Sequence, residues 1–251
     1  MALVWLAGPL AGVVGQPLFG LSSDQSRMSW GKRRPFIAGG AVFMILSLLG
    51  LAWVKEIVYM SSWILWGSMD RDALQTATLT AAAIFVWILN FAIQPLQGGL
   101  RALIVDCNPP EQMDVANAWA SRMVSAGSLI GYGSGFFDLP RLMYGAGGSK
   151  FQRLSVFAVL GLAFAVCLCC LFIQEQDPNE DGPPSRELRS TMGKLRHICK
   201  AMVNLHPSMI QVFKVQFCSW IGWFSFLYYI STYISEICMS MWSPFNILTL
   251  K

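Results

Sequence analysis

Long apolar segments separated by short polar ones dominate this chain. About six of them approach the roughly 20 residues that a helix needs to cross the hydrocarbon core of a bilayer. They lie at about 2–22, 35–54, 77–100, 116–137, 154–174 and 211–235. Because lipid offers no hydrogen-bond partners to the backbone, segments of this kind are expected to be helices. The pattern predicts an all-α integral membrane protein.

The composition agrees with a protein dissolved in a lipid bilayer. Apolar residues make up 55% of the chain and charged residues 13%, against about 25% charged residues in a soluble domain. The net charge of +4 is too small and too dispersed to predict a nucleic-acid partner. Most of the seven cysteines lie in apolar runs, which favours small buried hydrophobes over a metal site or a disulfide framework.

No catalytic motif is found along the chain. The sequence contains no GxSxG elbow, HExxH pair, P-loop or dinucleotide-binding fingerprint. We therefore expect neither an enzyme nor a protein with a cofactor.

Basic residues cluster on one side of the predicted membrane, which sets the orientation. If residue 1 lies outside the membrane, the segments on the inner side contain more lysine and arginine than the outer ones, and these residues are more clustered. These residues are Arg27, Lys32, Arg33, Arg34, Arg186, Arg189, Lys194, Arg196 and Lys200. The segment 175–210 is then cytoplasmic.

A polar linker divides the predicted helices into five and one. We expect residues 1–174 to be part of an N-terminal transmembrane half and 175–210 to be a central cytoplasmic linker. Residues 211–237 are then the first helix of a C-terminal half, and 238–251 are an atypical tail. A five-plus-one division predicts a truncated member of a two-half transporter.

Two groups of motifs resemble a known family. Gly20-Leu-Ser-Ser-Asp24 followed by Gly31-Lys32-Arg33-Arg34 resembles the loop after the second helix of the major facilitator superfamily. Within that superfamily the chain resembles the sucrose–proton symporters. The motifs that carry this closer resemblance are Trp5-Leu-Ala-Gly-Pro-Leu-x-Gly, Gln16-Pro, Ser23-Asp24, Lys32-Arg-Arg-Pro-Phe-Ile37, Arg101-Ala-Leu-x-x-Asp106, Ala116-Asn-Ala-Trp119 and Trp220-Ile-Gly-Trp-Phe224.

The resemblance implies a helical bundle that corresponds to helices 2–7 of twelve. It further implies proton-coupled uptake of sucrose or a related glucoside by alternating access, most plausibly at the plasma membrane rather than the vacuolar membrane. A truncated chain that does not transport but pairs with another membrane protein is the alternative, and an uncoupled sugar facilitator is a third possibility.

The resemblance also implies roles for single residues. Arg101 corresponds to a membrane-embedded arginine that takes part in substrate and proton binding in the family. Eleven residues earlier the family usually has an aspartate, and this chain has Asn90, which cannot titrate. The amides Gln94 and Gln97 flank a proline on the same predicted helix and are candidates for the cavity lining. The presence of Arg101 in an apolar segment can also be explained by a side chain that extends, or snorkels, to the membrane interface.

The loop between the first two predicted helices is a candidate gate. Its members are Gly20, Asp24, Gly31, Lys32, Arg33 and Arg34. Asp24 and the basic residues can lock helix ends by ion pairs, or they can be a topology signal alone. We expect Asp106, at the inner end of its helix, to pair with this basic loop.

Two further groups have a structural and a functional interpretation. Gly127, Gly131 and Gly135 share one helical face, and close helix packing is the favoured reason. Trp220 and Trp223 lie in an aromatic segment that fits stacking on sugar rings, although an interfacial belt explains it equally well.

Overall fold

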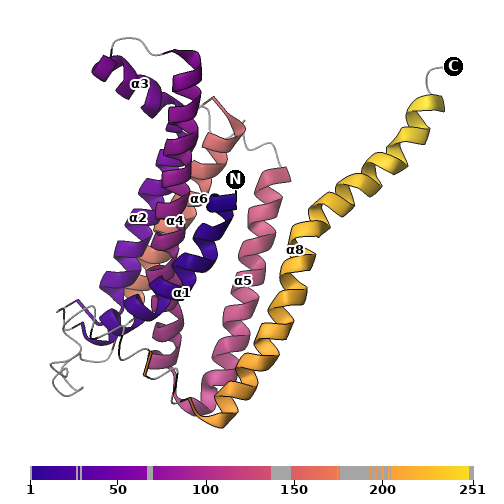
Figure 1. Ribbon diagram of the computed structural model, residues 1–251. Coiled ribbons are helices and arrows are strands. Elements are labelled where there is room, and N and C mark those ends of the chain that lie inside the picture. Colours follow the sequence, from indigo (N-terminus) through magenta and orange to yellow (C-terminus); the bar gives the residue numbers. More distant parts are fainter. Residues whose placement is uncertain are drawn as a thin grey trace. The chain divides into compact units, whose positions relative to one another are not determined.

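Helices account for all regular structure in the described part of the chain. The computed structural model describes residues 2–26, 28, 30–66, 70–136, 148–173, 175, 193, 196, 199–200, 203 and 205–248. The helices are α1 (Ala2–Asp24), α2 (Arg34–Ala52), α3 (Val54–Trp66), α4 (Arg71–Cys107), α5 (Met113–Phe136), α6 (Lys150–Phe172) and α8 (Pro207–Leu248). A short 3₁₀ turn, Pro110–Gln112, precedes α5. These ranges confirm the predicted all-α class (Figure 1).

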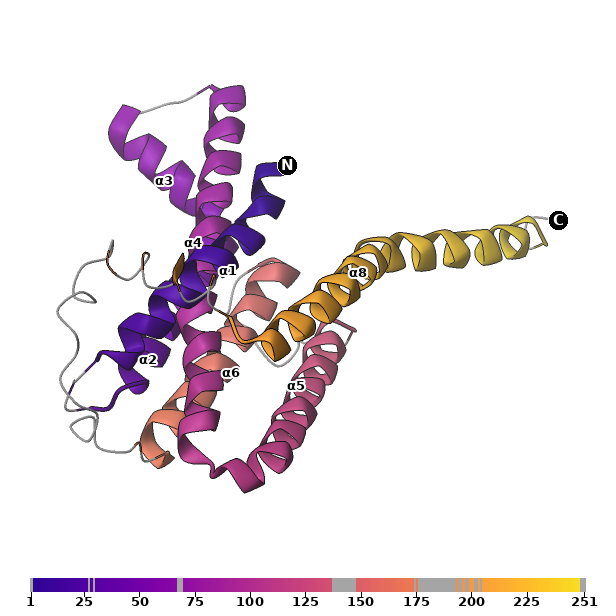
Figure 2. The same ribbon diagram turned by 60° about the horizontal axis from the view of Figure 1, so that its bottom comes forward.

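The chain divides into two units, Met1–Leu195 and Arg196–Lys251. In the first unit α4 packs against α1, α2 and α3, and α6 packs against α2. Both views show α1 and α2 running beside α4 (Figures 1 and 2). The helix α5 contacts α4 and α6 through few residues. The second unit contains α8, a single helix that continues past residue 237.

A small core holds α2, α4 and α6 together. Its buried members are Ile37 and Ala41 of α2 with Leu96 and Leu103 of α4, and side chains of α6 pack against them. A Cβ atom at Gly40 would lie 3.0 Å from a backbone atom of α4, so α2 and α4 approach closely at this point. Small residues at a helix crossing allow such an approach in membrane bundles.

The structure differs from the predicted segments at the connection between α2 and α4. A separate helix, α3, occupies part of a region that the hydrophobic pattern left outside any span. The helix α4 begins at Arg71 rather than 77, because the Asp70 side chain caps it by accepting a hydrogen bond from the Arg71 amide. Hydroxyls such as Thr76 Oγ1 donate to carbonyls one turn earlier, so polar residues are tolerated in this first part of α4.

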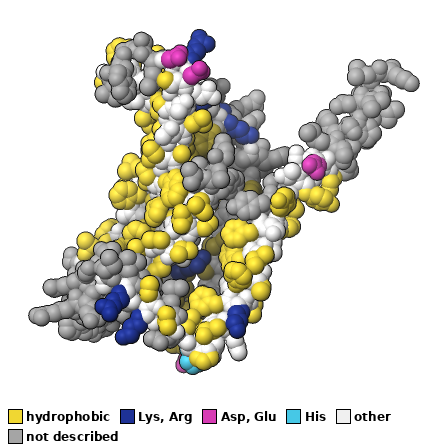
Figure 3. Space-filling model, viewed as in Figure 1, with side chains coloured by type: hydrophobic (Ala, Val, Ile, Leu, Met, Phe, Trp, Pro, Cys, Tyr) yellow, Lys and Arg dark blue, Asp and Glu magenta, His cyan; other side chains and the backbone are white. Residues whose placement is uncertain are grey.

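The surface is apolar, as expected of a membrane protein. Hydrophobic side chains cover much of the visible helical surface in Figure 3. In the described ranges three helices, α2, α4 and α6, are long and apolar enough to cross a membrane. The expected number of six spans stays a prediction.

Candidate functional site

Arg33 lies directly before α2 and joins the ends of three helices. Its Nε donates to Asp106 Oδ2 at the end of α4, at 2.8 Å. Its terminal nitrogen Nη1 pairs with Asp24 Oδ1 at the end of α1 and donates to Ser23 Oγ at 3.1 Å. We call Ser23, Asp24, Arg33, Asp106 and Glu175 the Arg33 cluster. The expected pairing of Asp106 with the basic loop is confirmed.

Burial and the neighbouring carboxylates shift the pKa of the Arg33 side chain in opposite directions. Its side chain is only 9% exposed, whereas those of Asp24 and Asp106 are 49% and 39% exposed. Burial lowers the pKa of the guanidinium, but the hydrogen bond to Asp106 and the two nearby carboxylates outweigh it and raise the pKa. Arg33 is therefore a permanent cation, and two carboxylates are needed to compensate its burial.

Glu175, which follows α6, attaches a fourth helix to this cluster. Its Oε2 accepts hydrogen bonds from the backbone amides of Lys32 and Arg33, the latter at 2.8 Å. Its Oε1 accepts from the Arg34 amide, also at 2.8 Å. The amides at the start of a helix have no partner within the helix and carry partial positive charge, so a carboxylate is a fitting cap. Glu175 thus caps α2 from the end of α6.

Gly31 makes room for this cap. Its φ of +123° belongs to a region that side chains rarely adopt. A Cβ atom there would lie 2.8 Å from Glu175 Oε2. Of the other predicted loop residues, Lys32 and Arg34 contribute their backbone amides to Glu175, and Gly20 lies in α1 with open space around it.

Arg101 lines a separate groove between α4 and α5. The groove has a volume of about 1120 Å³, and Ile173 lies at its edge. Its polar residues are Gln97, Arg101, Asn108, Asn117, Ser121 and Ser125. The two serine hydroxyls donate to carbonyls four residues earlier on α5, which leaves their oxygens as acceptors. The Arg101 groove therefore combines guanidinium and amide donors with hydroxyl and amide acceptors inside a mainly apolar wall.

Asn90 and Gln94 lie on a different face of α4, toward α1. A Cβ atom at Gly8 would lie 3.4 Å from Asn90 Oδ1, and one at Gly15 would lie 3.0 Å from Gln94 Cγ. Asn90 donates to the carbonyl of Val86 at 2.8 Å. Gln94 donates to the carbonyl of Asn90, and its Oε1 is buried with no hydrogen-bond partner among the described residues. The structure thus brings Gln97 together with Arg101, and places Asn90 and Gln94 at the helix crossing.

The remaining predicted residues belong to α8 and α5. Trp220 and Trp223 are in α8, where they contact Phe224 and Phe226 with ring centroids 5.4 Å and 5.8 Å apart. Gly127 and Gly131 of α5 are exposed and Gly135 is half-buried, and a Cβ atom at any of them would meet nothing within 4 Å. Their role in helix packing stays a prediction.

Sequence reasoning missed Glu175, and it included Ser23 in a family motif without predicting its hydrogen bond from Arg33. Glu175 opens an acidic, proline-containing segment and looks like an ordinary linker residue. Its contact with residues 32–34 spans more than 140 positions. A local pattern cannot reveal a contact of this kind.

Comparison with known proteins shows to which proteins the chain is homologous. No family model matches it. Over 237 residues it is 29% identical to a general alpha-glucoside permease from Schizosaccharomyces pombe, which covers 93% of this chain and 41% of the permease. The identity to sucrose transport protein SUT3 from Oryza sativa subsp. indica is also 29%, with 90% and 46% covered. The chain is homologous to sucrose and alpha-glucoside transporters. The resemblance predicted from the motifs is confirmed.

A shorter match adds to this kinship. Over 140 residues the chain is 34% identical to sucrose transport protein SUC4 from Arabidopsis thaliana, covering 55% of this chain and 26% of that protein. The chain spans less than half the length of these transporter relatives. All three are transport proteins rather than enzymes, which supports the prediction that this chain is not an enzyme.

Proposed function

We propose that this chain forms part of a carrier for sucrose or a related glucoside, which works by proton symport and alternating access at the plasma membrane. The observation that carries the proposal is the Arg101 groove, a mainly apolar hollow that presents Arg101 and several amides and hydroxyls between α4 and α5 of a sugar-transporter homologue. Residues 1–174 would belong to the N-terminal half and 211–237 to the C-terminal half. The segment 175–210 would be the cytoplasmic linker and 238–251 the tail.

The chemistry of the groove suits a sugar. A guanidinium presents five N–H donors in a fixed plane, and the amides of Gln97 and Asn117 offer both donors and acceptors. Sugar hydroxyls donate and accept, so they can satisfy both kinds of group. Trp220 and Trp223 of α8 are proposed, by their aromatic chemistry alone, as stacking surfaces for sugar rings.

The Arg33 cluster suits a gate. It joins the ends of α1, α2 and α4 and the residue after α6 by ion pairs and charge-assisted hydrogen bonds. Such bonds are strong only in one geometry and can be replaced by water when the helix ends separate. The loop Gly20, Asp24, Gly31, Lys32, Arg33 and Arg34 would therefore hold one state of the transport cycle.

Asn90 supports a second candidate, a facilitator without proton coupling. Its amide is held against the carbonyl of Val86 and cannot exchange a proton. The two candidates separate in one assay. Sucrose uptake that survives a protonophore supports the facilitator, and a proton current that begins on sugar addition supports the symporter.

The central test is sucrose binding and uptake by the chain reconstituted in liposomes. Arg101→Gln removes the charge and most donors from the groove, and we expect sucrose binding to weaken by about tenfold, the equivalent of about 1.4 kcal/mol. Arg122→Gln is the matched control, because Arg122 lies 5.0 Å from the Trp119 ring and is not among the groove residues. Equal binding by both variants would contradict the sugar site. Binding without uptake by the unchanged chain would support the non-transporting alternative.

A further inference from the structure

The helix α3 is too short to cross a membrane. It has 13 residues, Val54–Trp66, which correspond to a length of about 20 Å against a hydrocarbon core of about 30 Å. It follows α2 after the single residue Trp53, whose amide donates to the carbonyl of Leu49 at the end of α2. The start of α3 is therefore fixed at the end of one candidate membrane span, and α4, which follows it, is another.

One face of α3 packs on the protein and the opposite face is open. Val58 and Ser62 are buried, 8% exposed each, where α3 lies against α4. On the opposite face Ile57, Met60 and Ile64 recur at helical spacing and are 44%, 56% and 69% exposed. Tyr59 and Trp63 flank this open face and are exposed as well.

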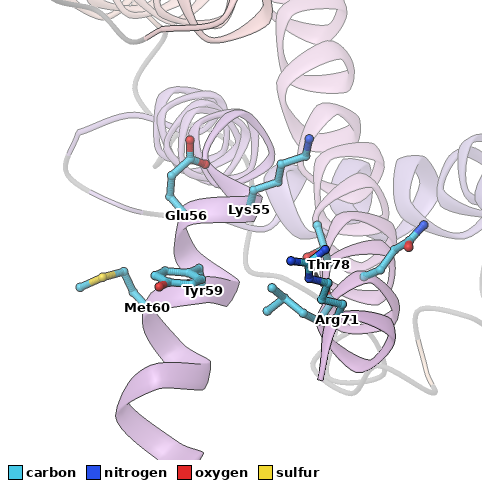
Figure 4. Close-up of a pocket in the computed structure, with 8 residues that line it drawn as sticks. Lys55, Glu56, Tyr59, Met60, Arg71 and Thr78 are labelled. Atoms are coloured by element: carbon cyan, nitrogen blue, oxygen red, sulfur yellow. Dashed lines mark hydrogen bonds between the residues drawn. The ribbon is translucent and has the colours of Figure 1, made fainter. Parts of the chain in front are cut away.

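A hollow between α3 and α4 carries two cationic side chains. It has a volume of about 590 Å³, and its lining includes Lys55, Glu56, Tyr59 and Met60 of α3 with Arg71 and Leu74 of α4. Figure 4 shows Tyr59 and Met60 on one side of it and Arg71 on the other.

Glu56 offsets part of the cationic charge in this hollow. It also lines the hollow, and its Oε1 accepts a hydrogen bond from Gln152 of α6, at 3.0 Å. Neither Lys55 nor Arg71 forms an ion pair with another side chain in the described ranges. The two cations and one carboxylate therefore leave the lining of the hollow with a small net positive charge.

We propose that α3 lies in the membrane interface and that the hollow beside it holds the phosphate headgroup of a bilayer phospholipid. Ile57, Met60 and Ile64 face the acyl chains, Tyr59 and Trp63 lie at headgroup depth, and Lys55 and Arg71 bracket the phosphate. Short helices with an apolar face, flanking aromatic residues and basic side chains are typical of the interface. A lipid is the fitting occupant because the exposed face of α3 is apolar, because α3 directly follows the candidate span α2, and because phosphate complements Lys55 and Arg71.

The depth of α3 can be measured in the full chain in nanodiscs that contain phosphatidylcholine and phosphatidylglycerol. Nitroxide labels are placed by Ile57→Cys, Met60→Cys and Ile64→Cys in a background without native cysteines. Asp72→Cys on the exposed start of α4 is the aqueous control, and Phe43→Cys on the exposed face of α2 is the control within the bilayer.

We expect the three α3 labels to be more accessible to oxygen than to a nickel chelate, with depths between the two controls. Nickel accessibility equal to that at position 72 would place α3 in water and overturn the proposal. Low accessibility to both reagents at all three positions would mean that another protein surface covers this face, and would overturn it as well.

The headgroup site is tested by counting the phospholipids that stay bound in native mass spectrometry. The variant K55Q/R71Q should retain at most half as many phospholipids as the unchanged chain. The variant K150Q/K214Q removes the same charge elsewhere and should retain the full number. Equal retention by the two variants would overturn the headgroup site, even if the labels place α3 in the interface.

Discussion

The carboxylate of Glu175 accepts a hydrogen bond at 2.8 Å from the backbone amide of Arg34, the first residue of α2. Two more amides of the preceding residues donate to the same carboxylate. The end of α6 therefore caps the start of α2, and Glu175 joins it to the loop that contains Arg33. A movement of either segment changes the position of the other.

Removing the cap should weaken the first unit. Glu175→Ala leaves three amides at the start of α2 without this acceptor, and we expect the free energy of unfolding to fall by about 1–2 kcal/mol. Urea or SDS titration in detergent micelles measures it. Glu111→Ala removes an exposed carboxylate from the 3₁₀ turn and should leave the stability unchanged. Equal effects of the two substitutions would show that Glu175 is no cap.

A side chain at Gly31 should conflict with the same carboxylate. Gly31→Ala combines an unfavourable φ with a Cβ atom 2.8 Å from Glu175 Oε2, and we expect a loss of about 1–3 kcal/mol. Gly20→Ala has open space in α1 and is the control. In a double-mutant cycle with Glu175→Ala, part of the loss at Gly31 should disappear, since the steric conflict is gone. Strictly additive losses would contradict this contact.

Arginine at position 33 should not be replaceable by lysine. Arg33→Lys keeps the charge, but one ammonium cannot reproduce the separate directions in which the guanidinium contacts Asp24 and Asp106. Because both carboxylates are partly exposed, we expect a moderate loss of about 1–2 kcal/mol. If the cluster gates transport, the uptake rate should change as well. Lys32→Arg, in which the contact to Glu175 is made by the backbone, is the comparison and should be nearly neutral.

Alanine substitutions at two adjacent glycines of α4 should have different effects on the stability of the protein. At Gly99 a Cβ atom would lie 2.7 Å from Ile37 Cγ1, whereas at Gly98 it would meet nothing within 4 Å. Gly99→Ala should destabilise the α2–α4 crossing by about 1–3 kcal/mol. Gly98→Ala should be neutral or slightly stabilising, because alanine favours the helix. Thermal unfolding of both variants measures this contrast, and a loss at Gly98 as large as that at Gly99 would disprove the packing assignment.

The sequence determined the class of the fold and the kinship of the chain. In lipid, the backbone of an apolar run of about 20 residues can form hydrogen bonds only with itself. The helices therefore follow from the composition and length of these runs alone. The spacing of charged and small residues around Asp24 and Arg33 was enough to predict the transporter family. It was also enough to predict that Asp106 meets the basic loop, because charge at a helix end needs a partner.

Only the tertiary structure decided which partners meet. Hydrophobic periodicity describes one helix at a time, so it could not place Glu175 on α2, or separate Asn90 and Gln94 from the groove that contains Gln97 and Arg101. It likewise assigned no helix to 54–66, because that segment is too short and too mixed to be recognised as a span. Contacts between distant segments depend on the directions in which packed helices present their side chains, and a linear pattern does not contain that information.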